Sequence, residues 1–316
     1  MLEIKTKNIS LISSGPRVKV QGWFVWCPEN PPRAILQISH GMCEYSARYG
    51  EFAAFMARSG YAVCLHDHPG HGETSNIAGS TDGYFGPGQG AARVLQAILT
   101  MNDRARREFP GLPVILLGHS MGSFFARWLA ECEPNAIDGL ILSGTAGPNP
   151  MLGAGIALSG LIARVRGERY RPQCVQKLAF GAYLSRIENP ETPHDWISRD
   201  REIVRRYAAD PKCTFVFTAS AFHEMFWVLR QVNRKDWYTR VPVDLPIRLM
   251  SGDADPVGDY GKGVETVYNR LMATGHEDTV LRLYEGGRHE MLNEIGREEV
   301  YQDVLAWCEE ILEKVD

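Results

Sequence analysis

The chain has 316 residues, of which 44% are hydrophobic and 23% are charged. These values are typical of a globular protein with one large α/β domain or two ordinary ones, and they exclude a wholly disordered chain and a disulfide-stapled miniprotein. The 38 acidic and 34 basic residues leave a net charge of −4, which disfavours a nucleic-acid-binding protein because such proteins bind largely by neutralising phosphates.

The cysteine content and the N-terminal ten residues indicate in which compartment the protein is located. The seven cysteines include no Cys-x-x-Cys pair, so they predict neither a disulfide framework nor a zinc site, and a reducing compartment fits them best. The opening sequence MLEIKTKNIS lacks the continuous apolar core of a signal peptide. We therefore expect a cytoplasmic protein.

Short apolar segments of strand length alternate with longer helical patterns along most of the chain. Apolar residues recur at the i, i+3, i+4, i+7 spacing of an amphipathic helix in residues 49–56, and again in residues 300–312. Continuous apolar strands separated by helices predict a mainly parallel sheet covered on both faces, with an antiparallel start before residue 34. The predicted strands are residues 17–27, 34–38, 61–65, 114–117, 137–142, 247–250 and 280–284.

One interval breaks this alternation. Roughly a hundred residues (144–245) separate two predicted strands, whereas a helical crossover needs only about a dozen. We therefore expect a core domain of residues 1–146 and 242–316 with a mostly helical cap of residues 147–241 inserted into it. The uncharged stretch 139–163 contains prolines and glycines, so we interpret it as a strand, a loop and an apolar segment and not as a membrane span.

The segment PVILLGHSMG, residues 113–122, is a buried strand followed by Gly-x-Ser-x-Gly and an apolar helical pattern. A strand that turns sharply into a helix strains the residue at the apex and brings neighbouring chain close to it. Gly118 and Gly122 would avoid the resulting collisions and leave the hydroxyl of Ser120 exposed at the helix N-terminus. The bare motif occurs often by chance, but this setting predicts that Ser120 is a nucleophile.

A nucleophilic serine that attacks a carbonyl group needs two converging donors for the oxyanion. The amide of Met121 lies directly after Ser120, at the helix N-terminus. A His-Gly turn follows the strand at 34–38 in the sequence ISHGMCEYSARY, and it can present the amide of Met42 from the opposite side. The alternative is an ordinary strand-to-helix loop with Ser46 near a helix start.

The serine also needs a base, and the base needs a third group that orients it. Asp253 and Asp255 both follow a predicted strand in MSGDADPVG, although either could be a turn or helix-cap residue. The proline after Asp255 favours that residue as the start of the outward-turning loop. His289 follows the last strand and completes the order Ser…Asp…His, whereas His276 lies before that strand, at its opposite end.

Five motifs, HGMCEYSARY, HDHPGHG, PGLPVILLGHSMGS, SGDADPV and GGRHE, together resemble the monoacylglycerol lipase and lysophospholipase branch of the α/β-hydrolase superfamily, which is also labelled serine aminopeptidase-like. The resemblance implies a doubly wound, mostly parallel sheet of about eight strands, an inserted helical lid and no metal or organic cofactor. It assigns Ser120 as the nucleophile, Asp255 as the triad acid and His289 as the base, with the oxyanion amides at Met42 and Met121. It implies a serine hydrolase that cleaves a lipid-like ester, such as a monoacylglycerol or lysophospholipid, through an acyl-enzyme.

Two other enzyme classes stay open. His66, His68 and His71 in LHDHPGHG could bind zinc in a binuclear hydrolase, although Gly70 stands where an aspartate ligand would be expected. In a serine hydrolase, Asp67 and His71 would instead hold the loops near the site by hydrogen bonds. An amidase or aminopeptidase on the same fold would need an acidic anchor for the substrate ammonium group, and the insertion offers Glu168, Glu188, Glu191, Glu202 and Glu224.

Two further readings are disfavoured. A catalytically silent binding protein does not fit, because every triad position is filled. Epoxide hydrolases share the architecture, but they need an aspartate in place of Ser120.

The insertion carries an apolar stripe and a basic segment. Phe222, Met225 and Phe226 share one helical stripe, which either packs the lid onto the main domain or binds the substrate in an acyl-chain tunnel. The apolar residues 151–163 precede a basic segment, residues 164–177. This combination predicts peripheral contact of the lid with an anionic membrane, and a buried hinge is the alternative.

Overall fold

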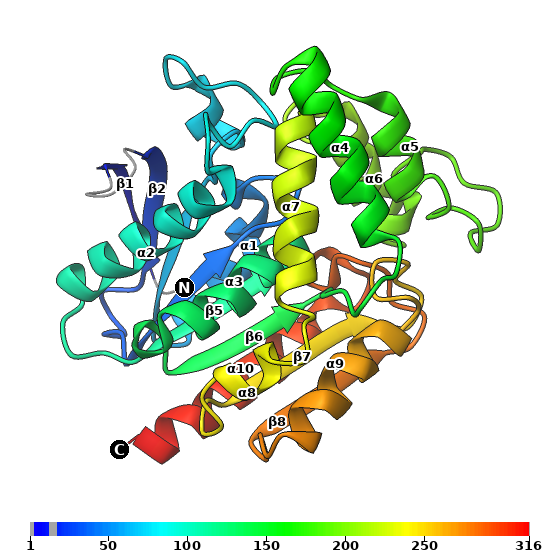
Figure 1. Ribbon diagram of the computed structural model, residues 1–316. Helices are drawn as coiled ribbons and strands as arrows, with labels where there is room; N and C mark the ends of the chain where they lie inside the picture. Colours follow the sequence, from blue (N-terminus) through cyan, green and yellow to red (C-terminus); the bar gives the residue numbers. More distant parts are fainter. Residues whose placement is uncertain (1–2, 13–17, 316) are drawn as a thin grey trace.

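Eight strands form a single sheet in the order β1-β2-β4-β3-β5-β6-β7-β8 (Figure 1). The computed structural model describes residues 3–12 and 18–315. Strand β2 pairs antiparallel with both β1 and β4, and the other neighbouring strands are parallel. The strands are β1 (Lys5–Ile12), β2 (Lys19–Trp26), β3 (Ala34–Ser39), β4 (Tyr61–His66), β5 (Val114–His119), β6 (Gly139–Ser143), β7 (Ile247–Gly252) and β8 (Thr279–Tyr284).

The mainly parallel sheet with an antiparallel start confirms the predicted fold class. Strand β1 was not predicted as a separate strand, because its sequence KTKNISLI is mostly polar and it lies at the edge of the sheet, where only Leu11 is buried. Arg17, the first residue of the strand predicted at 17–27, lies outside the described residues.

Helices cover both faces of the sheet because the side chains of each strand alternate between them. In β5, Val114 and Leu116 belong to the hydrophobic cluster that includes α2, α3 and α9, whereas Ile115 and Leu117 belong to the cluster that includes α1 and α10. These flanking helices are α1 (Gly50–Arg58), α2 (Gly90–Glu108), α3 (Met121–Cys132), α9 (Lys262–Ala273) and α10 (Arg297–Val315).

Between β6 and β7 the described chain is helical, and it lies beside the end of the sheet where β5 leads into α3 (Figure 1). No helix in residues 3–12 or 18–315 is long and apolar enough to cross a membrane. The helices of this segment are α4 (Leu152–Arg166), α5 (Gln173–Phe180), α6 (Arg201–Ala209), α7 (Ala219–Gln231) and α8 (Trp237–Arg240). Short 3-10 turns occur at η1 (Ser46–Tyr49), η2 (Gly72–Asn76), η3 (Pro134–Ala136), η4 (Asp195–Ile197) and η5 (Met291–Asn293).

The glycines of α4 do not interrupt this helix, although glycine weakens helices in general. A Cβ atom on Gly155 would lie 3.2 Å from the ring of Phe226, and one on Gly160 would lie 2.9 Å from the ring of His223. Both rings belong to α7. Gly155 and Gly160 therefore permit the close packing of α4 against α7.

Candidate active site

Ser120 lies at a strained turn between β5 and α3, with φ 51° and ψ −122°. A Cβ atom on Gly118 would lie 2.6 Å from the carbonyl oxygen of Gly122, and one on Gly122 would lie 2.0 Å from the carbonyl oxygen of Ser39. Only glycine fits at these two positions, as the sequence predicts. The amide of Ser120 donates to the carbonyl of Ser143 at 2.8 Å, which ties the turn to β6.

His289 and Asp255 form a buried pair. The Nδ1 atom of His289 lies 2.8 Å from Oδ2 of Asp255, and their side chains are 3% and 0% exposed. The aspartate also accepts hydrogen bonds from the Val257 amide at 2.9 Å and from the Ser251 hydroxyl at 3.2 Å. Three donors thus hold the carboxylate in one orientation toward the imidazole.

The other two candidates for these roles lie elsewhere. The exposed Asp253 accepts a hydrogen bond from the amide of Gly286 at 2.7 Å, so it closes a surface turn. His276 is buried and lies 3.3 Å from the carbonyl oxygen of Val241, before β8 begins. The tertiary structure therefore places Asp255, and not Asp253, beside His289.

The pKa of His289 is raised above its ordinary value. Burial lowers the pKa, because it disfavours the charged imidazolium, but the charge of Asp255 and its hydrogen bond raise the pKa by more. An imidazole in this state accepts a proton more readily than a free one, which is what a general base requires.

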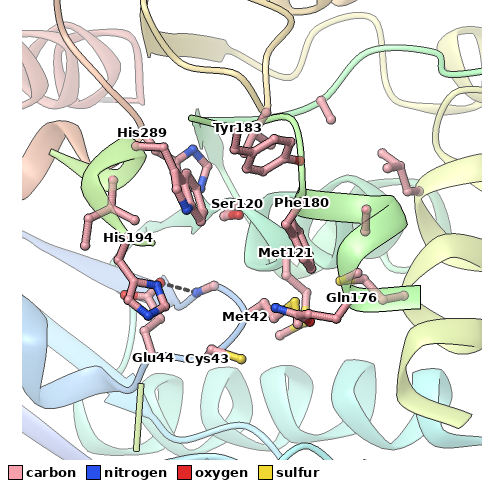
Figure 2. A pocket seen from close by; sticks show the side chains of 18 of the residues that line it. Met42, Cys43, Glu44, Ser120, Met121, Gln176, Phe180, Tyr183, His194 and His289 are labelled. Atoms are coloured by element: carbon pink, nitrogen blue, oxygen red, sulfur yellow. Dashed lines mark hydrogen bonds between the residues drawn. The ribbon is translucent and has the colours of Figure 1, made fainter. Parts of the chain in front are cut away.

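The loop after β3 passes directly against Ser120. A Cβ atom on Gly41 would lie 3.0 Å from Cβ of Ser120, and the amide of Gly41 donates to the carboxylate of Glu44. Figure 2 shows Met42 and Met121 close together below Ser120, and both residues line the same cavity. The Met121 amide is in the first turn of α3, where amides have no acceptor within the helix.

Met42, Ser120, Met121 and His289 all line one cavity of about 550 Å³. Figure 2 shows Ser120 and His289 at this cavity, with Gln176 and Phe180 of α5 across from His194 and Glu44. Residues of α4 and α7 also line it. The hydrophobic side chains that line it include Met42, Met121, Phe124, Leu152, Val175, Phe180, Met225, Phe226 and Leu229.

Of the three predicted substrate contacts on α7, Met225 and Phe226 line the cavity but Phe222 does not. Phe222 is fully buried, with its ring stacked on Phe226 at a centroid distance of 5.7 Å and tilted against Phe217 at the same distance. The prediction for Phe222 is corrected, because its side of α7 faces the protein interior.

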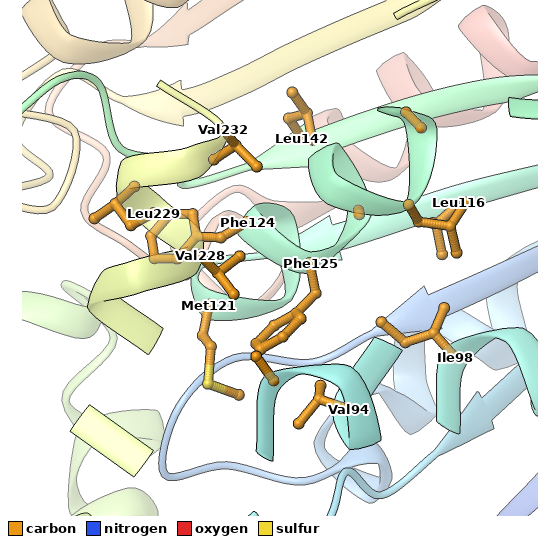
Figure 3. Packing of buried hydrophobic residues seen from close by; sticks show 14 of the residues in the cluster. Val94, Ile98, Leu116, Met121, Phe124, Phe125, Leu142, Val228, Leu229 and Val232 are labelled. Carbon is orange, nitrogen blue, oxygen red and sulfur yellow. The ribbon is translucent and has the colours of Figure 1, made fainter. Parts of the chain in front are cut away.

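Helix α7 forms a fixed wall of the cavity because it is packed into the main core. Figure 3 shows its residues Val228 and Leu229 beside Met121 and Phe124 of α3, and all four belong to the same hydrophobic cluster. Arg127 of α3 extends this attachment, since its guanidinium group donates to the carbonyl of Val232 at the end of α7.

A charged cluster beside the loop after β3 was not predicted. Arg48 forms two hydrogen bonds with Glu290, at 2.5 and 2.7 Å, and one with Glu44 at 3.2 Å. Burial and the charge of Glu290 raise the pKa of Glu44 to about 7, although Arg48 opposes this shift. Glu44 and Arg48 stand four residues apart in HGMCEYSARY, a spacing that could have indicated an ion pair.

The histidines considered as zinc ligands bond to one another and to neighbouring groups. The Nε2 atom of His66 lies 3.1 Å from Nδ1 of His68, whose Nε2 lies 3.0 Å from the hydroxyl of Ser39. His71 accepts a hydrogen bond from the amide of Cys43 at 3.4 Å. Burial lowers the pKa of His66 to about 3 and that of His71 to about 4, so both rings are neutral.

These contacts do not favour the zinc hypothesis. Within residues 3–12 and 18–315, no group of three or more His, Cys, Asp or Glu side chains is placed to hold a metal ion. Asp67 accepts hydrogen bonds from the amides of Ser46 and Glu73, at 2.9 and 2.7 Å, so it holds two loops near the site as predicted.

The acidic residues considered as an ammonium anchor do not line the cavity. Glu168 accepts from the hydroxyl of Tyr84, Glu191 pairs with Arg201, and the side chain of Glu224 accepts from the amides at the start of α2. The carboxylates that do line it, Glu44 and Glu290, are both bonded to Arg48. The structure therefore does not favour an aminopeptidase.

A sequence model of the family described as serine aminopeptidase, S33, matches residues 30–296. The chain belongs to this family of α/β-hydrolases. The hydrolase is 28% identical to a monoacylglycerol lipase of Mycolicibacterium smegmatis over 290 residues, which cover 90% of each chain. It is 26% identical to the monoglyceride lipase of Homo sapiens over 297 residues, which cover 92% of this chain and 88% of the human one.

A solved structure shows the same fold throughout. A carboxyl esterase from Bacillus coagulans, in complex with glycerol, is 31% identical to the hydrolase and superimposes on it with a TM-score of 0.90. The match covers 97% of this chain and 99% of the esterase. These similarities confirm the fold class and the family predicted from the five motifs.

Proposed function

We propose that this hydrolase cleaves carboxylic esters with Ser120 as nucleophile, His289 as base and Asp255 as the acid that orients it. The observation that carries the proposal is the buried His289–Asp255 pair, 2.8 Å apart, whose histidine lines the same cavity as Ser120. The similarity to a monoacylglycerol lipase, a monoglyceride lipase and a carboxyl esterase supports an ester as the substrate.

The mechanism follows from the placement of these groups. His289 takes the proton of the Ser120 hydroxyl, and the serine oxygen attacks the ester carbonyl. The amides of Met42 and Met121 donate to the oxyanion, and Asp255 stabilises the imidazolium. His289 then gives its proton to the departing alcohol, which leaves an acyl-enzyme. A water molecule deprotonated by His289 cleaves the acyl-enzyme, releases the carboxylic acid and restores Ser120.

We propose a monoacylglycerol or a similar single-chain lipid ester as the substrate. The cavity of about 550 Å³ lies within the range for drug-sized ligands. Its hydrophobic walls on α5 and α7 suit an acyl chain, where each buried methylene contributes about 0.8 kcal/mol. The carboxylates of Glu44 and Glu290 line another part of the cavity, where hydroxyl groups of an alcohol could donate hydrogen bonds.

The function is tested with purified protein and three substrates: a monoacylglycerol, a lysophospholipid and an aminoacyl amide. We expect hydrolysis of the monoacylglycerol, labelling of Ser120 by a fluorophosphonate and loss of both in Ser120→Ala. Turnover of the amide alone would refute the ester assignment. Ester turnover by Ser120→Ala at the wild-type rate would refute the assigned nucleophile.

We also propose that residues 147–241 act as a lid over a core of residues 1–146 and 242–316. The support is that α4, α5 and α7 of this segment all contribute residues to the cavity wall, and that α7 attaches the segment to the core. A disulfide engineered between α5 and the core would test this proposal. It should slow hydrolysis of a long-chain ester in the oxidised form, and reduction should restore the rate. An unchanged rate would contradict the lid assignment.

The lid is further proposed to contact anionic membranes. One stripe of α4 is exposed and apolar, with Leu161 and Val165 exposed by 60% and 69%, and the basic Arg164 and Arg166 lie beside it. Co-sedimentation with anionic vesicles at physiological salt should fall in Leu161→Glu and in Arg164→Ala. Failure of the wild-type protein to pellet would rule the contact out.

A further inference from the structure

A segment of the insertion runs along the loop that carries His289. We call residues 195–200 the strap and residues 288–294 the histidine loop. The amide of Glu290 donates to the carbonyl of Ile197 at 2.7 Å, and the amide of His289 donates to the carbonyl of Trp196 at 3.4 Å. The guanidinium group of Arg288 donates to two strap carbonyls, those of residues 195 and 198, at 2.6 and 3.0 Å.

Glu294 joins the two segments through its side chain, which is fully buried. Its carboxylate accepts hydrogen bonds from the amide of Arg199 in the strap at 2.9 Å and from the amide of Arg288 in the histidine loop at 2.9 Å. It also accepts from the amide of Ile295 at 2.8 Å and from the hydroxyl of Ser198 at 3.3 Å. A buried carboxylate with this many donors favours one arrangement of their backbone, because hydrogen bonds to a charged group are strong and a buried carboxylate loses stability with each one that is broken.

The strap also touches the imidazole itself. The ring centroids of Trp196 and His289 are 5.1 Å apart. The ring of His119 also contacts the imidazole, with a centroid distance of 4.6 Å. The indole comes from the insertion, whereas His119 and Asp255 come from the core. The position of the base therefore depends on a segment outside the core.

We infer that Glu294 is a positioning residue for His289, which acts by clamping the strap to the histidine loop. The inference rests on the proposed function, in which His289 is the base. Glu294 is not one of the residues that line the cavity, so it acts on the base and not on the bound substrate. The amides of residues 199 and 288 both donate to its buried carboxylate, and the second of these amides immediately precedes His289.

A purely structural role would be different. In that case Glu294 would only attach the insertion to the core, as Glu224 does when it accepts hydrogen bonds from the amides of Gly90 and Ala91 at 3.2 and 3.1 Å. Losing such an attachment would lower stability without changing the chemical step. Glu224→Gln is therefore a matched control, because it alters a second carboxylate that bonds core and insertion away from His289.

The test compares Glu294→Gln with Glu224→Gln in steady-state hydrolysis of a p-nitrophenyl ester across pH. Glutamine keeps one acceptor oxygen but replaces the other by an NH2 group, which cannot accept from an amide. A misplaced base on the order of 1 Å can cost about 100-fold in rate, so we expect kcat of Glu294→Gln to fall by about 10- to 100-fold with KM changed less than about threefold. The acidic limb of its pH profile should move to lower pH, because His289 loosens from Asp255. Glu224→Gln should keep the wild-type kcat and limb.

Two further variants keep the test decisive. Ser198→Ala removes one donor to Glu294 and should lower kcat in the same direction by a smaller factor, so it carries the test if Glu294→Gln does not fold. Wild-type kcat and pH profile in both Glu294→Gln and Ser198→Ala would overturn the inference. His289→Ala separates the two proposals: if it remains active, the proposed base is wrong, and if it is inactive while Glu294→Gln is unaffected, only the positioning role is wrong.

Discussion

Replacing Asp255 by asparagine removes the charge that faces His289 while keeping the size of the side chain. When His289 takes the serine proton, a positive charge forms at a centre about 4 Å from the carboxylate. At an effective dielectric constant of about 20, this pair contributes about 4 kcal/mol, or about a thousandfold in rate. The amide of Val257 donates to Oδ1 at 2.9 Å and needs an oxygen there, so the new NH2 group would face His289. The imidazole would then carry its proton on Nε2, where it cannot accept from Ser120, and the total loss should approach about 10⁴-fold.

The assay is kcat/KM for a short p-nitrophenyl ester from pH 5 to 9. The base must be neutral, so activity is lost as pH falls through the pKa of His289. Asp255 raises this pKa above its ordinary value, so the acidic limb of the wild-type enzyme should lie above about pH 6.5. Without the carboxylate, only the weaker effects of Glu290 and Glu44 oppose the lowering of the pKa by burial, so the limb should move to lower pH.

The exposed Asp253 supplies the control, because Asp253→Asn alters a surface turn two residues away and should leave kcat/KM within about twofold of wild type. The reasoning would be refuted if Asp255→Asn retained more than about a tenth of the wild-type activity with an unchanged acidic limb. A loss of activity in Asp253→Asn, with the activity of Asp255→Asn unchanged, would show that Asp253 and not Asp255 is the triad acid.

Three other changes test the turn, the cavity and the charged cluster. Gly122→Ala should destabilise the fold by about 3 kcal/mol or more in chemical denaturation, because its Cβ would lie 2.0 Å from a backbone oxygen. Gly153→Ala is the control: its Cβ would have no neighbour within 4 Å, so it should stabilise α4 by up to about 1 kcal/mol. Equal effects of the two changes would contradict this account of the turn. Met225→Ala should lower kcat/KM for a dodecanoyl ester by at least about fourfold more than for an acetyl ester, because fourfold is the effect of losing the burial of about one methylene group. An equal change in kcat/KM for both esters would contradict the acyl tunnel. The folded protein holds the proton of Glu44 up to about pH 7, so the free energy of unfolding should fall as the pH rises from about 5 to 7. In Glu44→Gln, chemical denaturation at a series of pH values should show a smaller decline. An unchanged decline would contradict the raised pKa of Glu44.

The residues that could be assigned from the sequence are those whose role depends on local backbone geometry. Gly118 and Gly122 flank Ser120 in a strand-turn-helix pattern, and the collisions that exclude larger residues there arise from that turn. Met121 follows from the same turn, since it begins the helix. The choice of triad acid lay between Asp253 and Asp255, and the proline after Asp255 favoured that residue. The order of the strands placed His289 at the same end of the sheet as Ser120.

The positions that the sequence left open depend on contacts between distant segments. Phe222 and Met225 share a helical stripe, but only the packing of α7 decides that Met225 faces the cavity while Phe222 faces Phe217. Arg48 bonds to Glu290, 242 residues away, and Glu294 bonds to Arg199, 95 residues away. The sequence by itself determined the fold class and the turn that presents Ser120, because these follow from short-range patterns of side-chain size and polarity, and its five motifs identified the family by resemblance. The tertiary structure alone decided which charges meet and which rings line the cavity, because burial and electrostatic pairing are set by distances in space and not along the chain.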